Sequence, residues 1–257
     1  MTEHRSGCWP TELVVPLDGS RLAERALHVA GRLARHLAIG VRTVTCAEAV
    51  GCADVAGACA RSRTLAQWGI EDPAPAVEVV ARLHAELPGR VACVSSHGRG
   101  GPGHGPLGGV ADALIRSDQV PVLVVGPSCP SGWLDGGGPV VGCLTEEAAP
   151  DEGTNAAVVA ATRRWARALG HDARLVTVVT TGAHEGGRVP GVEVLCSTHP
   201  AAAIQSSAVR DRASLLVLGP HRGGAAGGSR HVMRPLLAGA PCPVFVPSAS
   251  SDCAAQG

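Results

Sequence analysis

Two hydrophobic patterns alternate along the chain: short continuous apolar runs, and longer stretches in which apolar residues recur every three or four positions. The first apolar run covers residues 13–17, and helical spacing follows it through residue 37. A short apolar run predicts a strand buried on both faces, and the longer spacing predicts an amphipathic helix. We place Ser20 at the N-cap of that helix and Gly40 at its end.

The alternation continues through the first half. Further strands are predicted at residues 41–46, 63–68, 91–94 and 120–125, and helices at residues 73–87 and 110–116. Residues 47–62 give only weak signals. Small residues dominate there, so neither period is visible.

The second half repeats this order. Strands are predicted at residues 139–143, 175–179, 192–196, 215–218 and 242–246. Thr154 is a candidate cap for a helix with the buried face Val158, Thr162, Trp165 and Leu169, and His199-Pro200 opens another helix. The glycine-rich loops occupy corresponding places in the two halves.

This repetition predicts an α/β protein with two tandem, doubly wound, mainly parallel five-stranded sheets and helices on both faces. We assign residues 10–128 to the first unit and residues 139–249 to the second. The Pro- and Gly-rich residues 129–138 form the linker. The last strands, 120–125 and 243–246, are apolar, and we expect them to pair the two units within one chain.

Composition agrees with this architecture and excludes several classes of function. Hydrophobic residues make up 45% of the chain and aromatic residues only 2%, so Val, Leu and Ala must form the core. All 22 basic residues are arginine, which excludes Walker-type, Schiff-base and catalytic lysines. The formal net charge is zero, so we expect no nucleic-acid partner. No apolar stretch approaches membrane-spanning length and no apolar leader is visible, so we expect a cytoplasmic protein without a membrane partner.

The ten cysteines do not predict a metal site. In a reducing compartment they are thiols. Cys46, Cys52 and Cys59 lack the paired spacing of zinc ligands, and Cys93, His97 and His104 have no recognised metal spacing either. A structural role is the simpler interpretation.

The candidate chemistry lies where the strand at 91–94 ends in Ser95-Ser96-His97-Gly98. A strand that enters a glycine-rich loop and then a helix is suited to holding phosphate, because backbone N–H groups approach an anion closely. Asp18 and Cys46 end the first two strands, and these residues meet at the same edge of the sheet. Taken singly, Asp18 is equally a turn or cap residue, and the loop is equally a flexible connection.

Two competing motifs are weaker. Gly98, Gly100 and Gly103 match the dinucleotide fingerprint, but they follow the fourth strand rather than the first, and prolines delay the helix. Ser96-His97 does not form a nucleophile elbow, because position 94 is Val. We expect His97 to orient the loop by hydrogen bonding, and Arg99 to pair with phosphate or remain solvated.

Several stretches together resemble the universal stress protein family. They are V-V-P-L-D-G-S, S-S-H-G-R-G-G and P-V-L-V-V in the first half, and L-G-P-H-R-G-G and A-P-C-P-V-F-V in the second. The resemblance covers almost the whole chain as two tandem copies, and it implies an adenine-nucleotide-binding, Rossmann-like fold. It also implies a bacterial stress-response protein.

For the first half the resemblance implies a nucleotide site with these residues: Pro16, Leu17, Asp18, Cys46, Ser95, His97, Gly98, Arg99, Gly108, Gly109 and Val110. The family's phosphate motif is Gly, two residues, Gly, nine residues, Gly and then Ser or Thr. Gly98, Gly108 and the spacing between them are kept, while Ser95 and Gly109 depart from the motif. In the second half the family's Asp falls on Leu144, Arg222 replaces a glycine, and the loop before Gly228 is short. We therefore expect that half to be degenerate.

The expected function is that of a tandem universal stress protein that binds ATP, with or without Mg²⁺, in its first unit and regulates an unknown protein partner. No positioned nucleophile or base is evident, so slow ATP hydrolysis is the most that the resemblance implies. The alternative is an interaction module in which both nucleotide sites have decayed. Association of two chains stays open.

Overall fold

The computed structural model describes residues 9–17, 20–45, 48–51, 78, 80–82, 84–85, 89–97, 107–145, 153–179, 190–219 and 228–248. Its centre is one ten-stranded sheet in the order β3-β2-β1-β4-β5-β10-β9-β6-β7-β8. The α/β class and the mainly parallel sheet are therefore confirmed. The two five-stranded sheets expected from the sequence are joined edge to edge.

The strands in chain order are β1 (Glu12–Leu17), β2 (Gly40–Thr45), β3 (Glu48–Gly51), β4 (Arg90–Ser95), β5 (Val122–Val125), β6 (Val140–Leu144), β7 (Ala173–Val179), β8 (Val192–Cys196), β9 (Leu215–Leu218) and β10 (Val244–Val246). The helices are α1 (Arg21–Leu37), α4 (Gly109–Ser117), α5 (Gly153–Leu169), α6 (Pro200–Arg210) and α7 (Gly228–Gly239), with a short 3₁₀ helix at Trp133–Gly136. β5 and β10 pair antiparallel in the middle of the sheet, and the strand order is the same on either side of this pair.

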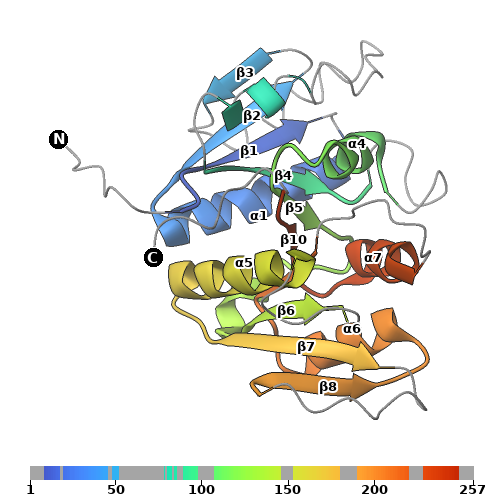
Figure 1. The fold of residues 1–257 in the computed structure, drawn as a ribbon. Helices are drawn as coiled ribbons and strands as arrows, with labels where there is room; N and C mark the ends of the chain where they lie inside the picture. Colours follow the sequence, from blue (N-terminus) through green and yellow to red (C-terminus); the bar gives the residue numbers. More distant parts are fainter. Residues whose placement is uncertain are drawn as a thin grey trace.

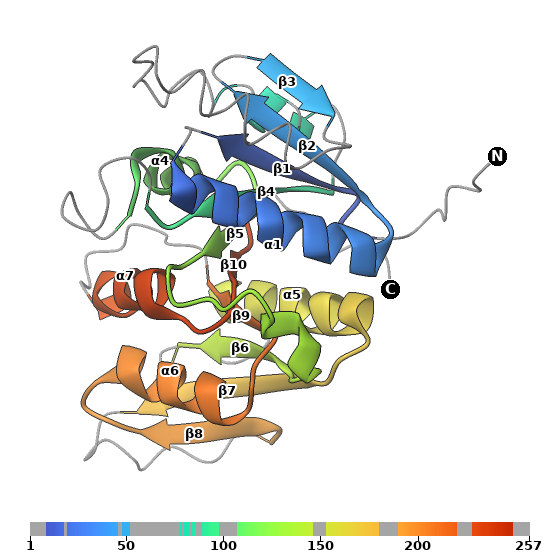
Figure 2. The same ribbon diagram turned by 180° about the vertical axis from the view of Figure 1, so that it is seen from behind.

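Helices cover both faces of the sheet. α1 and α5 contact each other on one face, and α4, α6 and α7 lie on the opposite face (Figures 1 and 2). The layers follow from the connections, since a right-handed crossover places its helix on the face set by the direction in which the chain moves across the sheet.

Several elements differ from the sequence prediction at their ends. Ser20 caps α1 as predicted, accepting a hydrogen bond from the Ala23 backbone N–H at 3.1 Å. The helix does not run to Gly40, because Ala38 adopts the left-handed conformation at its C-cap and Gly40 begins β2. Thr154 lies inside the first turn of α5 and is not its cap.

β3 and α7 are described elements that the sequence did not predict. β3 lies in the stretch with weak signals and pairs antiparallel with β2. The strand predicted at 63–68 lies outside the described residues, while residues 78, 80–82, 84 and 85 are helical, inside the helix predicted at 73–87. α7 was not predicted, and it contains Pro235.

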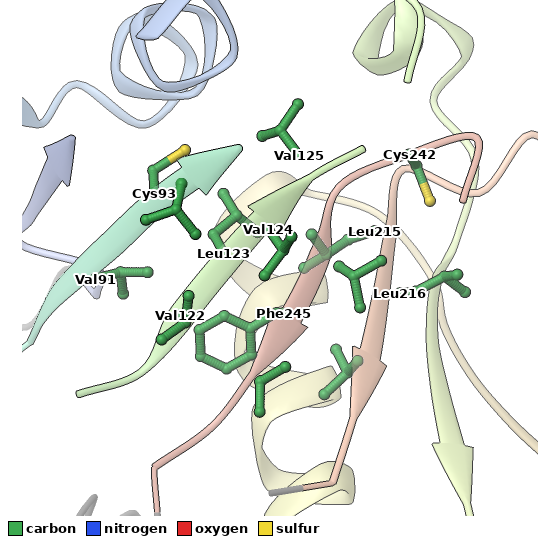
Figure 3. Packing of buried hydrophobic residues seen from close by; sticks show 14 of the residues in the cluster. Val91, Cys93, Val122, Leu123, Val124, Val125, Leu215, Leu216, Cys242 and Phe245 are labelled. Atoms are coloured by element: carbon green, nitrogen blue, oxygen red, sulfur yellow. The ribbon is translucent and has the colours of Figure 1, made fainter. Parts of the chain in front are cut away.

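The core runs without interruption through the central strands. Side chains of β4, β5, β9 and β10 pack together there, and they include Val91, Leu123, Leu216 and Phe245, each at most 1% exposed (Figure 3). Apolar runs buried on both faces are the expected signature of a sheet covered by helices on both sides.

An aromatic cluster joins the two ends of the chain across this core. Trp9 precedes β1, Trp165 lies on α5 and Phe245 on β10, and the three rings meet edge to face at centroid distances of 5.0–5.6 Å. The Arg164 guanidinium lies 4.4 Å from the Trp9 ring centroid. Much of the chain's small aromatic content is therefore placed where the first and second halves meet.

Residues 129–135 are attached to both halves. Arg25 of α1 donates to the Cys129 carbonyl at 2.8 Å, and Arg32 donates to the Ser131 carbonyl at 2.7 Å. The Trp133 indole N–H donates to the Ser214 carbonyl at 2.7 Å, next to β9. The segment predicted as a linker thus packs against both halves.

Candidate functional site

The candidate site lies at the carboxyl ends of β1 and β4. These strands are hydrogen-bonded neighbours, and from them the chain proceeds outward in opposite directions across the sheet. Such a switch point is where open α/β sheets bind ligands. Pro16 and Leu17, at the end of β1, are both buried.

Ser95, Ser96 and His97 form the turn that leaves β4. The Ser95 hydroxyl donates to the His97 carbonyl at 2.6 Å, and Ser96 Oγ lies 2.9 Å from His97 Nδ1. The Ser96 and His97 side chains are nearly buried, at 1% and 5% exposed. No described residue hydrogen-bonds the other ring nitrogen of His97, Nε2.

The loop returns to this turn at the start of α4. The Gly108 N–H donates to the Ser96 carbonyl at 2.7 Å, which holds the helix start beside the end of β4. Gly108 occupies the N-cap and supplies no side-chain acceptor, while Gly109 is exposed and Val110 half-buried. The first N–H groups of α4 therefore lack a side-chain cap, and they carry the positive end of the helix dipole.

Seven of the predicted site residues are described, and the structure brings them to this one edge of the sheet: Pro16, Leu17, Ser95, His97, Gly108, Gly109 and Val110. Asp18, Cys46, Gly98 and Arg99 lie outside the described residues. In the sequence, Asp18 falls between the end of β1 and the cap Ser20, and Cys46 directly follows β2.

The matching position in the second half follows from the strand register. A local two-fold axis passes between Leu123 and Phe245, because Val122 pairs with Val246 and Val124 with Val244. This axis relates β5 to β10. It therefore also relates their neighbours β4 and β9, and then β1 and β6.

On β4 and β9, the axis relates Ala92 to Leu216, which pair with Val122 and Val244. On β1 and β6, it relates Val14 to Val141, which pair with Ala92 and Leu216. Four residues further along each chain, Asp18 corresponds to Thr145. The assignment of this position to Leu144 from the sequence is thus wrong by one residue. Sequence reasoning aligned the apolar run, whereas the hydrogen-bond register determines the true correspondence.

Thr145 is held by Asn155 of α5. Asn155 is 1% exposed. Its Oδ1 accepts from the Thr145 N–H at 2.9 Å and from the hydroxyl at 3.2 Å, while its Nδ2 donates to the Thr145 carbonyl at 3.1 Å. α1 and α5 both span 17 residues, and each is followed by a strand in matching register. Asn155 therefore corresponds to Ala23 in the first half, which has no polar side chain to offer.

The end of β9 is covered as well. Gly219 corresponds to Ser95, and a Cβ added at Gly219 would lie 2.2 Å from Thr154 Cγ2. Thr154 and Asn155 thus lie against the ends of β9 and β6. The sequence pointed to Thr154 only as a helix cap and did not point to Asn155, because what shows their role is a contact between distant segments and not a motif.

Four of the five described cysteines are buried in the core. Cys93, Cys129, Cys143 and Cys242 are buried free thiols. Burial raises the pKa of Cys129 and of Cys143 to about 12, so both remain protonated. No group of three metal-ligating side chains occurs among the described residues. Within the same residues, no helix is both long and apolar enough to cross a membrane.

Comparison with solved structures identifies the fold. A universal stress protein from Archaeoglobus fulgidus DSM 4304 matches with a TM-score of 0.61 at 13% sequence identity, over 93% of this chain and 98% of that chain. A functionally unknown protein from Pseudomonas aeruginosa PAO1 and a proposed universal stress protein from P. aeruginosa UCBPP-PA14 each match with a TM-score of 0.57 at 15% identity, over 92% of both chains. No protein-family model and no curated protein sequence matches the chain. The chain therefore has the universal stress protein fold.

Proposed function

We propose that the chain is a cytoplasmic tandem universal stress protein that binds an adenine nucleotide, ATP in the first instance, at the carboxyl ends of β1 and β4. The observation that carries the proposal is the meeting of three features at one point. They are two adjacent strand ends, the turn at Ser96-His97, and the start of α4, whose N-cap Gly108 offers no side-chain acceptor. An anion at that point would accept hydrogen bonds from the uncapped N–H groups at the start of α4.

The residues divide the nucleotide between them. The chain has no lysine to neutralise the phosphates. The N–H groups at the start of α4 and the Arg99 guanidinium would bind them instead. The Ser96 hydroxyl can donate to His97 Nδ1, which leaves Nε2–H as a donor to a phosphate oxygen. Asp18 cannot bind phosphate directly, because like charges repel, but it can accept from a ribose hydroxyl or the adenine amino group, or help to hold Mg²⁺.

The same geometry favours binding over chemistry. Ser96 is buried and bonded to His97, and within the described residues neither side chain has the further partner that a nucleophile and its base would need. We therefore propose a regulator that uses nucleotide occupancy as a signal to a protein partner. Slow ATP hydrolysis is compatible with this role.

The proposal assigns one nucleotide to each chain. In the second half, Asn155 and Thr154 lie on the strand ends where a nucleotide would bind. Asn155 is bonded to both backbone groups of Thr145, and removing its side chain would cost these hydrogen bonds.

The test is to denature the purified protein and look for released ATP by mass spectrometry. The melting temperature with and without ATP and Mg²⁺ is then measured, since a ligand that binds only the folded state raises it. Asp18→Ala should abolish the rise. Thr145→Ala, the related position in the second half, is the matched control and should leave it intact.

The alternative, an interaction module without a nucleotide, is favoured by two observations. The Ser95 side chain lies where the family has glycine and is already bonded to His97, and Gly109 lacks the phosphate-binding hydroxyl. Absence of released nucleotide together with an unchanged melting temperature at millimolar ATP and Mg²⁺ would establish that alternative.

A further inference from the structure

Positive charge is concentrated on one face of this electrically neutral chain. α1 and α5, which contact each other, carry seven arginines: Arg21, Arg25, Arg32, Arg35, Arg163, Arg164 and Arg167. Their one acidic residue, Glu24, is 7% exposed. These arginines come from two helices that are far apart in the sequence, so no continuous run of basic residues reveals the face.

Three of the seven arginines have structural partners. Arg25 donates to the Cys129 carbonyl, Arg32 donates to the Ser131 carbonyl and pairs with Asp135, and Arg164 lies over Trp9. Their positions are explained by the attachment of the linker and of the N-terminal segment.

The other four are exposed and have no hydrogen bond or ion pair within the described part of the chain. They are Arg21, Arg35, Arg163 and Arg167, and we call them the basic face. His36 Nε2 lies 3.1 Å from the Leu169 carbonyl, so the C-terminal ends of α1 and α5 meet. Arg35 and Arg167, close to those ends, are thereby brought to one surface.

Helix stability does not account for the whole basic face. A cation in the last turn is stabilised by the helix dipole, which suffices for Arg35 and Arg167. Arg21 is the first residue of α1, where the dipole opposes a positive charge, and Arg163 lies in the interior of α5. Within the described residues none of these four charges has an ion-pair partner, and such an unpaired set points to a ligand that supplies the negative charge.

We propose that the basic face binds an acidic segment of a partner protein. The guanidinium group presents a planar pair of donors that matches a carboxylate. The face is short, since α1 is about 25 Å long at 1.5 Å per residue. The 22 acidic residues of the neutral chain lie almost entirely outside the two helices. A nucleic acid would extend past the face and meet those charges, whereas a short acidic segment would not.

Arg35, Arg163 and Arg167 are separate from the start of α4, which lies on the opposite face of the sheet (Figures 1 and 2), whereas Arg21 follows Asp18 by three residues. The inference therefore does not depend on nucleotide binding. An acidic partner held on α1 would also contact the helix whose cap, Ser20, lies two residues after Asp18 in the sequence.

The test uses the full chain and a fluorescein-labelled peptide rich in Glu and Asp, followed by fluorescence anisotropy. Binding should weaken strongly between about 50 mM and about 200 mM salt, as expected for exposed charge pairs. Arg163→Glu/Arg167→Glu should weaken it by about tenfold or more, whereas the matched pair Arg116→Glu/Arg234→Glu, on α4 and α7, should not. Circular dichroism of both variants verifies folding.

Three results would overturn the proposal. The first is no peptide binding at low salt. The second is an equal loss in the two double variants, which would show non-specific attraction. The third is tighter binding of a random-sequence oligonucleotide through the same arginines, which would assign the basic face to nucleic acid.

Discussion

Thr162 of α5 occupies the space that a side chain at position 142 of β6 would need. A Cβ added at Gly142 would lie 2.3 Å from Thr162 Oγ1. At the corresponding places in the first half, β1 has Val15 and α1 has Ala30. The two halves thus fill the same space between strand and helix with opposite combinations of large and small residues.

Gly142→Ala should therefore destabilise the protein by about 2 kcal/mol through overpacking. Thr162→Ala removes the nearest clashing atom, although Leu175 Cδ2 would still lie 2.9 Å from the added Cβ, and it also removes the hydroxyl that donates to the Val158 carbonyl at 2.7 Å. In the double variant the cost should be clearly smaller than the sum of the two single costs. Urea unfolding of all four proteins gives the coupling energy. Strict additivity would show that the contact does not constrain Gly142.

Trp9→Ala should weaken the junction between the two ends of the chain. Trp9 packs against Trp165 at 5.0 Å and against Phe245 at 5.6 Å, so the variant loses aromatic contacts on both. We expect a loss of about 2 kcal/mol, measured by urea unfolding with circular dichroism. Trp9→Phe, which keeps one aromatic ring, should recover part of the loss. A Trp9→Ala variant as stable as the wild type would mean that the cluster does not join the halves.

Acidification should destabilise the fold through His171. Burial lowers the pKa of this imidazole below its ordinary value of 6.5, nearby His36 lowers it further, and Asp172 acts in the opposite direction. The unfolded state therefore binds the proton more readily than the folded state. The free energy of unfolding is highest above pH 6.5 and decreases as the pH falls below that value.

The melting temperature of the wild type should thus fall more steeply between pH 7.5 and pH 5.5 than that of His171→Asn. Asn keeps a polar group near the Ser214 hydroxyl, which lies 2.9 Å from His171 Nδ1. Parallel profiles for the two proteins would assign the acid sensitivity to other groups.

Alkylation should distinguish the cysteines by burial. Cys196 is exposed at the end of β8, whereas Cys93, Cys129, Cys143 and Cys242 are buried and protonated at neutral pH. In the native protein, N-ethylmaleimide should modify Cys196 and spare these four, and all should react in urea. Peptide mapping by mass spectrometry reads out each site. Rapid native labelling of Cys129 would contradict the closed packing of the linker on α1.

Local pattern was sufficient for most strands because their apolar runs are unbroken. β8 and β9 have the predicted bounds, and α6 begins with Pro200 as predicted. α7 was missed because Pro235 and the neighbouring glycines interrupt its period. β3 was missed because four residues between weak signals carry no pattern of their own.

The site was predictable only as far as its residues are contiguous. The turn at Ser95–His97 follows from the sequence because a strand precedes it, and the predicted helix start at Val110 is one residue from the observed start at Gly109. The pairing of Asn155 with Thr145 does not, because it joins residues ten positions apart through a contact that no periodicity encodes. The correspondence of Thr145 with Asp18 required the strand register.

The pair at the local two-fold axis is unlike: Leu123 of β5 faces Phe245 of β10. In an assembly of two identical chains, a residue on such an axis meets its own copy, so one substitution changes both sides at once. Here the two sides are different positions of one chain, so each can be substituted without the other. A large ring can therefore face a smaller side chain, and a substitution in one half leaves the matching position of the other half unchanged.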